Sequence, residues 1–191
     1  GVTIAKVDSN MEPIPGTEEL IECDTLILSV GLIPENELAE TIGVTINNAT
    51  KGPTCDQRYM TEIPGVFSCG NALHVNDLVD YVSESGEKAG EAAALFEYNE
   101  QNNITVKSTR DYLYVVPQLL DLDSLDDEVT FFFRTASQRD KTKISLLLDG
   151  KPIFTKAYES LRPPEMEKII VPLSKSKLEK NSNLKFVMEV I

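Results

Sequence analysis

Short apolar runs alternate with polar loops through the first half of the chain. Residues 25–30 read TLILSV, a mostly apolar run bounded by Asp24 and Gly31. A run this short, with apolar residues on both faces, is typical of a strand buried inside a parallel sheet. Residues 66–69 form a second short apolar run that ends at Gly70, and they predict another buried strand.

Residues 77–97 give the clearest helical pattern in the chain. Their apolar side chains recur mostly at helical spacing, and a series of serine, glycine and alanine residues makes one face small. Asp77 comes immediately before the first apolar residue and is predicted to be the N-cap. A helix with such a small face can lie close to a sheet or to a ligand.

The pattern changes at Ile104 to short strand-like runs separated by turns. Seven such runs follow one another in the second half, which is the pattern of an all-β, immunoglobulin-like sandwich. Asp149-Gly150 is a strong signal for a two-residue hairpin. The chain has no tryptophan, so the prediction concerns architecture and not common ancestry with immunoglobulins. The predicted strands are residues 104–107, 112–116, 128–135, 143–148, 152–158, 167–171 and 184–190.

These patterns divide the chain into two predicted domains. Residues 1–98 are expected to form an α/β domain, and residues 104–191 a β-sandwich accessory domain. The polar residues 99–103, which read NEQNN, are the expected linker.

Composition and charge narrow the classes of function. Hydrophobic residues make up 41% of the chain, and 31 acidic against 18 basic residues give a net charge of −13. Such a charge repels a phosphate backbone, so nucleic acid and anionic membranes are excluded as expected partners. No apolar run approaches the ~20 residues that cross a bilayer, and no signal peptide is visible. We therefore expect a cytoplasmic protein without a membrane span.

The cysteines and acidic residues suggest no metal or redox site within the chain. The three cysteines, Cys23, Cys55 and Cys69, are odd in number and form no C-x-x-C pair, so we expect reduced thiols. The acidic residues show no recognisable metal-ligand spacing, and no metal is predicted.

Two stretches together carry a resemblance to a known family. Residues 23–36 read CDTLILSVGLIPEN, and residues 61–71 read TEIPGVFSCGN. In this order they resemble the pyridine nucleotide-disulfide oxidoreductase superfamily, where the first stretch leaves the nicotinamide-binding domain and the second returns to the flavin domain. The resemblance covers residues 1–98. It implies an α/β fragment of a flavoprotein that has two dinucleotide-binding domains.

The same resemblance implies where flavin would be contacted. In the family, an acidic residue at the position of Asn71 accepts a hydrogen bond from a ribityl hydroxyl, and here an amide replaces it. Backbone N–H groups at the start of the following helix would face the pyrimidine edge, where reduced flavin carries negative charge. The alternatives are that Asn71 is a simple turn residue and that the helix only packs on a sheet. The predicted cofactor-binding residues are Gly70, Asn71, Asp80, Tyr81 and Val82, and no catalytic residue is predicted.

The chain contains no G-x-G-x-x-G fingerprint, the loop that holds the pyrophosphates of FAD and NAD(P)H in this family. We therefore expect a C-terminal fragment of a FAD- and NAD(P)H-dependent oxidoreductase with an unidentified acceptor. The fragment alone should be inactive and bind neither cofactor tightly. Its expected partner is the remainder of its own polypeptide, with a homodimer as a further option.

Two other interpretations stay open on the sequence. The chain could be a non-catalytic interaction module whose sandwich binds protein or carbohydrate. His74, the single histidine, could transfer protons beside a flavin, but a histidine on a surface loop is the favoured interpretation.

Overall fold

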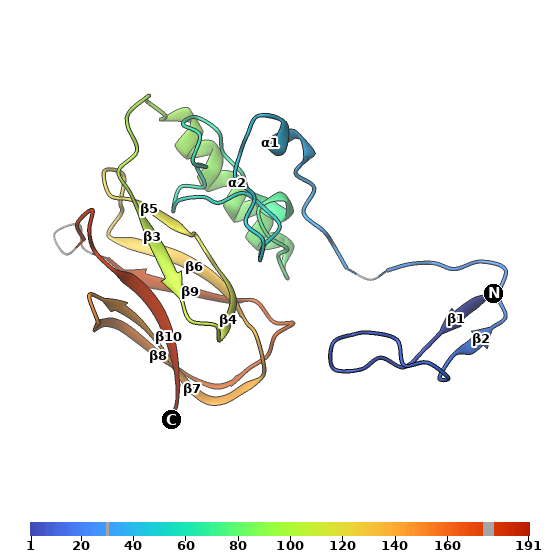
Figure 1. The fold of residues 1–191 in the computed structure, drawn as a ribbon. Helices are drawn as coiled ribbons and strands as arrows, with labels where there is room; N and C mark the ends of the chain where they lie inside the picture. The colour runs from blue at the N-terminus through green and yellow to red at the C-terminus, as the bar shows by residue number, and fades with distance from the viewer. Residues whose placement is uncertain (30, 174–177) are drawn as a thin grey trace. The chain divides into compact units, whose positions relative to one another are not determined.

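The protein is described by a computed structural model that covers residues 1–29, 31–173 and 178–191 (Figure 1). The chain divides by its internal contacts into two compact units, Gly1–Leu32 and Ile33–Ile191.

The first unit contains one small antiparallel ribbon. Strand β1 (Val2–Ile4) pairs with β2 (Glu19–Ile21), with Val2 opposite Ile21. Residues 25–29 form no strand, and the side chains of this run are exposed, Ile27 by 85%. The predicted buried strand is therefore wrong over residues 25–29, while Val30 lies outside the described residues. An apolar run is buried only where neighbouring strands pair with it, and the described residues supply no such strand.

Residues 33–98 of the second unit hold three short or medium helices and little regular sheet. They are α1 (Glu37–Thr41), the 3₁₀ helix η1 (Gly70–Ala72) and α2 (Val79–Ala94). The predicted strand at residues 66–69 is wrong, because only Phe67 makes a bridge, to Met60. The turn at Ile63-Pro64-Gly65 sends this segment back along residues 59–61, where Ser68 N–H donates to the carbonyl of Tyr59 at 2.9 Å.

Helix α2 confirms the strongest helical pattern but begins later than predicted. Its N-cap is Leu78, and no side chain caps the helix. The prediction of Asp77 as N-cap is wrong, because the Asp77 carboxylate is used by Arg134 and by the backbone N–H of Met166. Both carboxylate oxygens of Asp77 thus accept from groups outside the helix, and neither caps its first turn.

Two sheets occupy the rest of the second unit. Their strand orders are β5-β3-β10-β7-β8 and β4-β6-β9. β10 runs parallel to β3, and the other pairs are antiparallel. The strands are β3 (Asn103–Ser108), β4 (Tyr112–Val116), β5 (Leu119–Asp121), β6 (Glu128–Thr135), β7 (Arg139–Leu148), β8 (Lys151–Leu161), β9 (Glu167–Pro172) and β10 (Leu184–Val190).

The seven predicted runs are all strands, and β5 is an additional strand that the pattern did not reveal. The hairpin at Asp149-Gly150 is also confirmed: both residues have positive φ, and Leu148 pairs with Lys151. The immunoglobulin-like type of the sandwich stays a prediction, as do the domain boundaries around residues 99–103.

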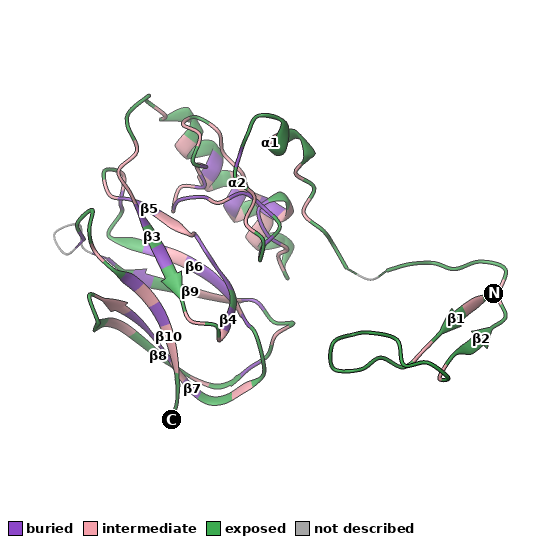
Figure 2. Ribbon diagram, viewed as in Figure 1, coloured by how far each residue is buried: buried purple, intermediate pink, exposed green. Residues whose placement is uncertain are grey.

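Side chains from both sheets share one core. Figure 2 shows buried positions on strands of both sheets. Phe131 of β6 meets Phe186 of β10 edge-on, with ring centroids 5.1 Å apart, and both rings are fully buried. Strand β4 contributes Tyr112 and Val115 to this core. Tyr114 and Val116 of the same strand belong to a second cluster with side chains from residues 55–89. Strand β4 therefore joins the sheets to the segment that contains η1 and α2.

Candidate functional site

The segment from Gly70 to the start of α2 contains most of the predicted flavin contacts. Gly70 is buried at a φ of +61°, and its N–H donates to Oγ of Ser85 at 2.8 Å. A Cβ at this position would lie 3.1 Å from Cγ1 of Val82. The structure thus brings two of the predicted residues, Gly70 and Val82, into direct contact at the helix.

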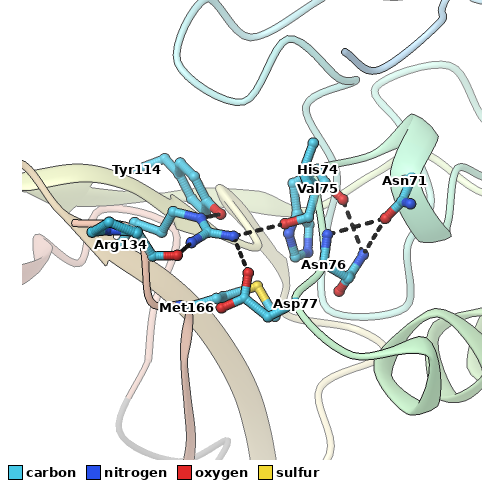
Figure 3. A network of polar contacts seen from close by, with 9 residues as sticks. Asn71, His74, Val75, Asn76, Asp77, Tyr114, Arg134 and Met166 are labelled. Carbon is cyan, nitrogen blue, oxygen red and sulfur yellow. Dashed lines mark hydrogen bonds and ion pairs between the residues drawn. The ribbon is translucent and has the colours of Figure 1, made fainter. Parts of the chain in front are cut away.

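Asn71 is fixed by hydrogen bonds within the same segment (Figure 3). Its Oδ1 accepts the backbone N–H of Asn76 at 3.0 Å and also lies 3.4 Å from Nδ2 of Asn76. Because a backbone N–H can only donate, the oxygen of the Asn71 amide must face Asn76. The Asn71 side chain can therefore offer a ligand its Nδ2 donor, whereas the acidic residue expected from the family resemblance would offer an acceptor.

The first turn of α2 is open to solvent. Leu78 is 51% exposed and Val79 is 77% exposed. The N–H of Tyr81 donates to the carbonyl of Leu78 at 3.1 Å. The helix geometry then leaves the N–H groups of Val79 and Asp80 without a partner inside the helix. These two amides, with the positive end of the helix dipole, are suited to a negatively charged atom.

The side chain of Tyr81 turns toward the sheets. Its ring lies 5.6 Å from the ring of Phe132 on β6. Nζ of Lys168, on β9, lies 5.2 Å from the Tyr81 centroid and pairs with Glu84. Among the predicted residues, Tyr81 therefore fastens α2 to the sheet by its ring.

A polar network holds the loop before α2 against β6 (Figure 3). Nε of Arg134 donates to Oη of Tyr114 at 2.8 Å, and its Nη2 donates to the carbonyl of Val75 at 3.3 Å. The same guanidinium pairs with the carboxylate of Asp77. The other carboxylate oxygen of Asp77 accepts the N–H of Met166 at 2.6 Å. Sequence reasoning missed this network, because its members are far apart in the chain.

His74 is buried against the rings of Tyr114 and Phe132 and does not lie on a surface loop. It is 2% exposed, and its ring centroid is 5.9 Å from that of Tyr114 and 5.5 Å from that of Phe132. Burial lowers the pKa of His74 to about 4, and the nearby Arg134 charge acts in the same direction. The expectation of a surface histidine is wrong, because the loop is drawn onto the rings of β4 and β6. A neutral, enclosed imidazole supports packing and not proton transfer at neutral pH.

Asn36 and Gly52 both contact the backbone of η1 at Ala72. Nδ2 of Asn36 donates to the carbonyls of Lys51 and Ala72, both at 2.9 Å. Gly52 lies against the backbone of Ala72 and Leu73. A surface pocket of about 670 Å³ opens beside Asn36 and Ala72. Asn36 was not predicted as a site residue, although it ends the first of the two stretches that carry the family resemblance.

Asp56 is a second unusual polar group of this region. It is 1% exposed, and its Oδ1 accepts the N–H groups of Arg58 at 2.8 Å and Met60 at 3.0 Å. Burial raises the pKa of Asp56 to about 6, despite these two hydrogen bonds, and the charge of Asp121 adds to the rise.

Comparison with known proteins identifies the class of this chain. The sequence model of the pyridine nucleotide-disulphide oxidoreductase family matches residues 1–106, and the chain belongs to that family. No solved structure matches the chain. No helix among the described residues is long and apolar enough to span a membrane.

Proposed function

We propose that this chain supplies part of the flavin site of an oxidoreductase that uses FAD and NAD(P)H. Family membership supports an oxidoreductase as the parent protein. The observation that carries the flavin assignment is the set of donors on one short segment. Nδ2 of Asn71 and the N–H groups of Val79 and Asp80 all lie between η1 and the first turn of α2.

These donors suit the chemistry of a flavin. A flavin held by these donors would supply hydride and electron transfer between a nicotinamide and an acceptor. The N–H groups of the first turn would stabilise negative charge at the pyrimidine edge, because the helix dipole is positive there. Asn71 would donate to an oxygen of the flavin or its ribityl chain. The exposed helix end leaves these groups accessible to a ligand.

The residues that hold the rest of each dinucleotide would lie elsewhere in the polypeptide. This chain has no G-x-G-x-x-G loop to hold a pyrophosphate. We therefore propose that residues 1–191 alone bind FAD weakly and do not catalyse electron transfer. The acceptor of the parent protein is not specified by any of these residues.

The test is a flavin assay on the full-length parent, with residues 1–191 as the matched control. The full-length protein should carry one flavin per chain, seen as the visible flavin absorption band, and the band should bleach when NADH or NADPH is added. The isolated chain should carry none. A full-length protein without flavin, or one whose flavin is reduced by neither nucleotide, would contradict the proposal and favour a non-catalytic interaction module.

A further inference from the structure

We infer that Arg134 is a positioning residue for the flavin and that the β sheets thereby help to set the affinity and the potential of the bound cofactor. This inference rests on the proposed function. Arg134 lies on β6, outside residues 1–106 that match the family. It contacts none of the proposed flavin donors and would act through Asp77 and Val75.

The guanidinium of Arg134 is almost fully committed to other protein groups. Nε donates to Tyr114 and Nη2 to the carbonyl of Val75, while Nη1 donates to the carbonyl of Pro164. The Arg134 side chain is 11% exposed and the Asp77 side chain 35%, so the ion pair is partly shielded from water. A planar guanidinium that uses several donors at once fixes its partners in direction as well as distance.

Asp77 is held from two sides, next to the N-cap of α2. One carboxylate oxygen takes the Arg134 ion pair, and the other accepts the N–H of Met166 at 2.6 Å. Leu78, the N-cap, follows directly. A shift of Asp77 would therefore move the free N–H groups of Val79 and Asp80 with it.

The same anchored segment orients Asn71. The N–H of Asn76, one residue before Asp77, donates to Oδ1 of Asn71. Nδ2 of Asn76 also donates to the carbonyl of His74 at 2.9 Å. Both proposed donor sets, the Asn71 amide and the first turn of α2, thus depend on the position of residues 74–77.

The attachment of this loop to the sheets does not need the ion pair. The apolar contacts of the second cluster, with Tyr114 and Val116 of β4 against Leu73 and Ala89, already join the two parts. Shielded ion pairs add little net stability, because desolvation offsets the attraction. The contribution of Arg134 and Asp77 is therefore the geometry of the loop more than the cohesion of the fold.

The experiment compares Arg134→Met with Arg139→Met in the full-length protein. Arg139 on β7 is a matched control, since its Nη2 pairs with Oδ1 of Asp111 at 2.6 Å and touches no residue of the loop. The readouts are the FAD dissociation constant, the flavin midpoint potential and the melting temperature. Arg134→Met should weaken FAD binding by about tenfold and make the potential more negative. Arg139→Met should leave both unchanged, even if it lowers the melting temperature as much.

Asp77→Asn gives a second variant in case Arg134→Met does not fold. It removes the charge and places an amide nitrogen opposite either Arg134 or the Met166 N–H, so it should weaken FAD binding in the same direction. FAD binding and a potential equal to wild type in Arg134→Met, or in Asp77→Asn if only that variant folds, would overturn the positioning role alone. A wild-type protein without flavin would instead overturn the proposed function.

Discussion

Gly52 and Leu73 approach each other so closely that a Cβ on Gly52 would lie 1.9 Å from the carbonyl oxygen of Leu73. The same Cβ would lie 2.6 Å from the carbonyl oxygen of Ala72. Both obstacles are backbone atoms, which cannot move aside as a flexible side chain can. The contact holds the loop around Gly52 against η1, the short helix that contains Gly70 and Asn71.

Gly52→Ala should therefore destabilise the protein, by about 3 kcal/mol, because the added methyl group must displace η1 or its own loop. Urea unfolding followed by circular dichroism measures the change. Gly86→Ala is the matched control: it makes the same chemical change inside α2, with nothing within 4 Å of the new Cβ. That control should gain up to about 1 kcal/mol from helix propensity. Equal stabilities of the two variants would show that η1 does not rest on Gly52.

Asn71→Leu should reduce flavin binding more than Asn71→Asp does. Leucine removes the Nδ2 donor and leaves the Asn76 N–H without its acceptor, whereas aspartate keeps that acceptor. The loss for leucine should be about tenfold or more in the FAD dissociation constant, measured by titration of the full-length apoprotein. An equal FAD affinity in the wild type and in both variants would show that Asn71 does not contact the flavin.

The stability of the protein should fall on acidification through the titration of His74. Burial holds its pKa at about 4 against an ordinary 6.5, so the unfolded chain takes up the proton first. The contribution of the neutral His74 ring to stability is fully present above about pH 6.5 and is lost as pH falls toward about 4. The loss is about 3 kcal/mol for a shift of this size. His74→Phe, which keeps an aromatic ring between Tyr114 and Phe132, should lack this contribution in unfolding curves taken across that range.

The titration of Asp56 should have the opposite effect on the stability of the protein. Its pKa is raised to about 6 from 3.8, so folding favours the protonated acid, and this contribution is lost as pH rises through about 6. Asp56→Asn keeps an acceptor for Arg58 and Met60 without the buried charge. The variant should be more stable than wild type at pH 7, by up to about 3 kcal/mol, and the gain should vanish near pH 4. A destabilised variant at pH 7 would show that the charge itself is needed.

Removal of residues 1–32 should leave the unfolding of residues 33–191 nearly unchanged. Among the described residues, neither core cluster contains one before Cys55, and the chain divides by its contacts between Leu32 and Ile33. The free energy of unfolding should change by less than about 0.5 kcal/mol, as expected for the loss of groups outside a core. Thermal unfolding of the two proteins gives the comparison. Loss of a cooperative transition in the shorter protein would contradict the independence of the second unit.

Much of the local structure could be predicted from residue patterns, because those patterns depend on near neighbours. The run at residues 128–135 became β6 with the predicted limits, and Asp149-Gly150 became the turn between β7 and β8. The helical pattern of residues 77–97 also predicted α2, apart from the residues at which the helix begins and ends. Strand β5 was missed because Leu119–Asp121 is only three residues long, too short for a period to show.

The site was only partly predictable. The two family stretches by themselves indicate Gly70 and Asn71, and the family is confirmed. The environment of these residues was not predictable. The position of Asp77 beside a helix pattern suggested a cap, and no local signal connects it with Arg134, which lies 57 residues further along the chain.

The sequence alone determined the family of this protein, the strands of its second half other than β5 and the helix that follows Asn71, since turn residues and apolar periods specify these locally. Only the tertiary structure decided that His74 is buried, that Asp77 pairs with Arg134, and that residues 25–29 stay exposed. Burial and ion pairing depend on which distant segments meet. The local residue pattern does not show whether an apolar run has a partner strand or whether a histidine packs between two rings.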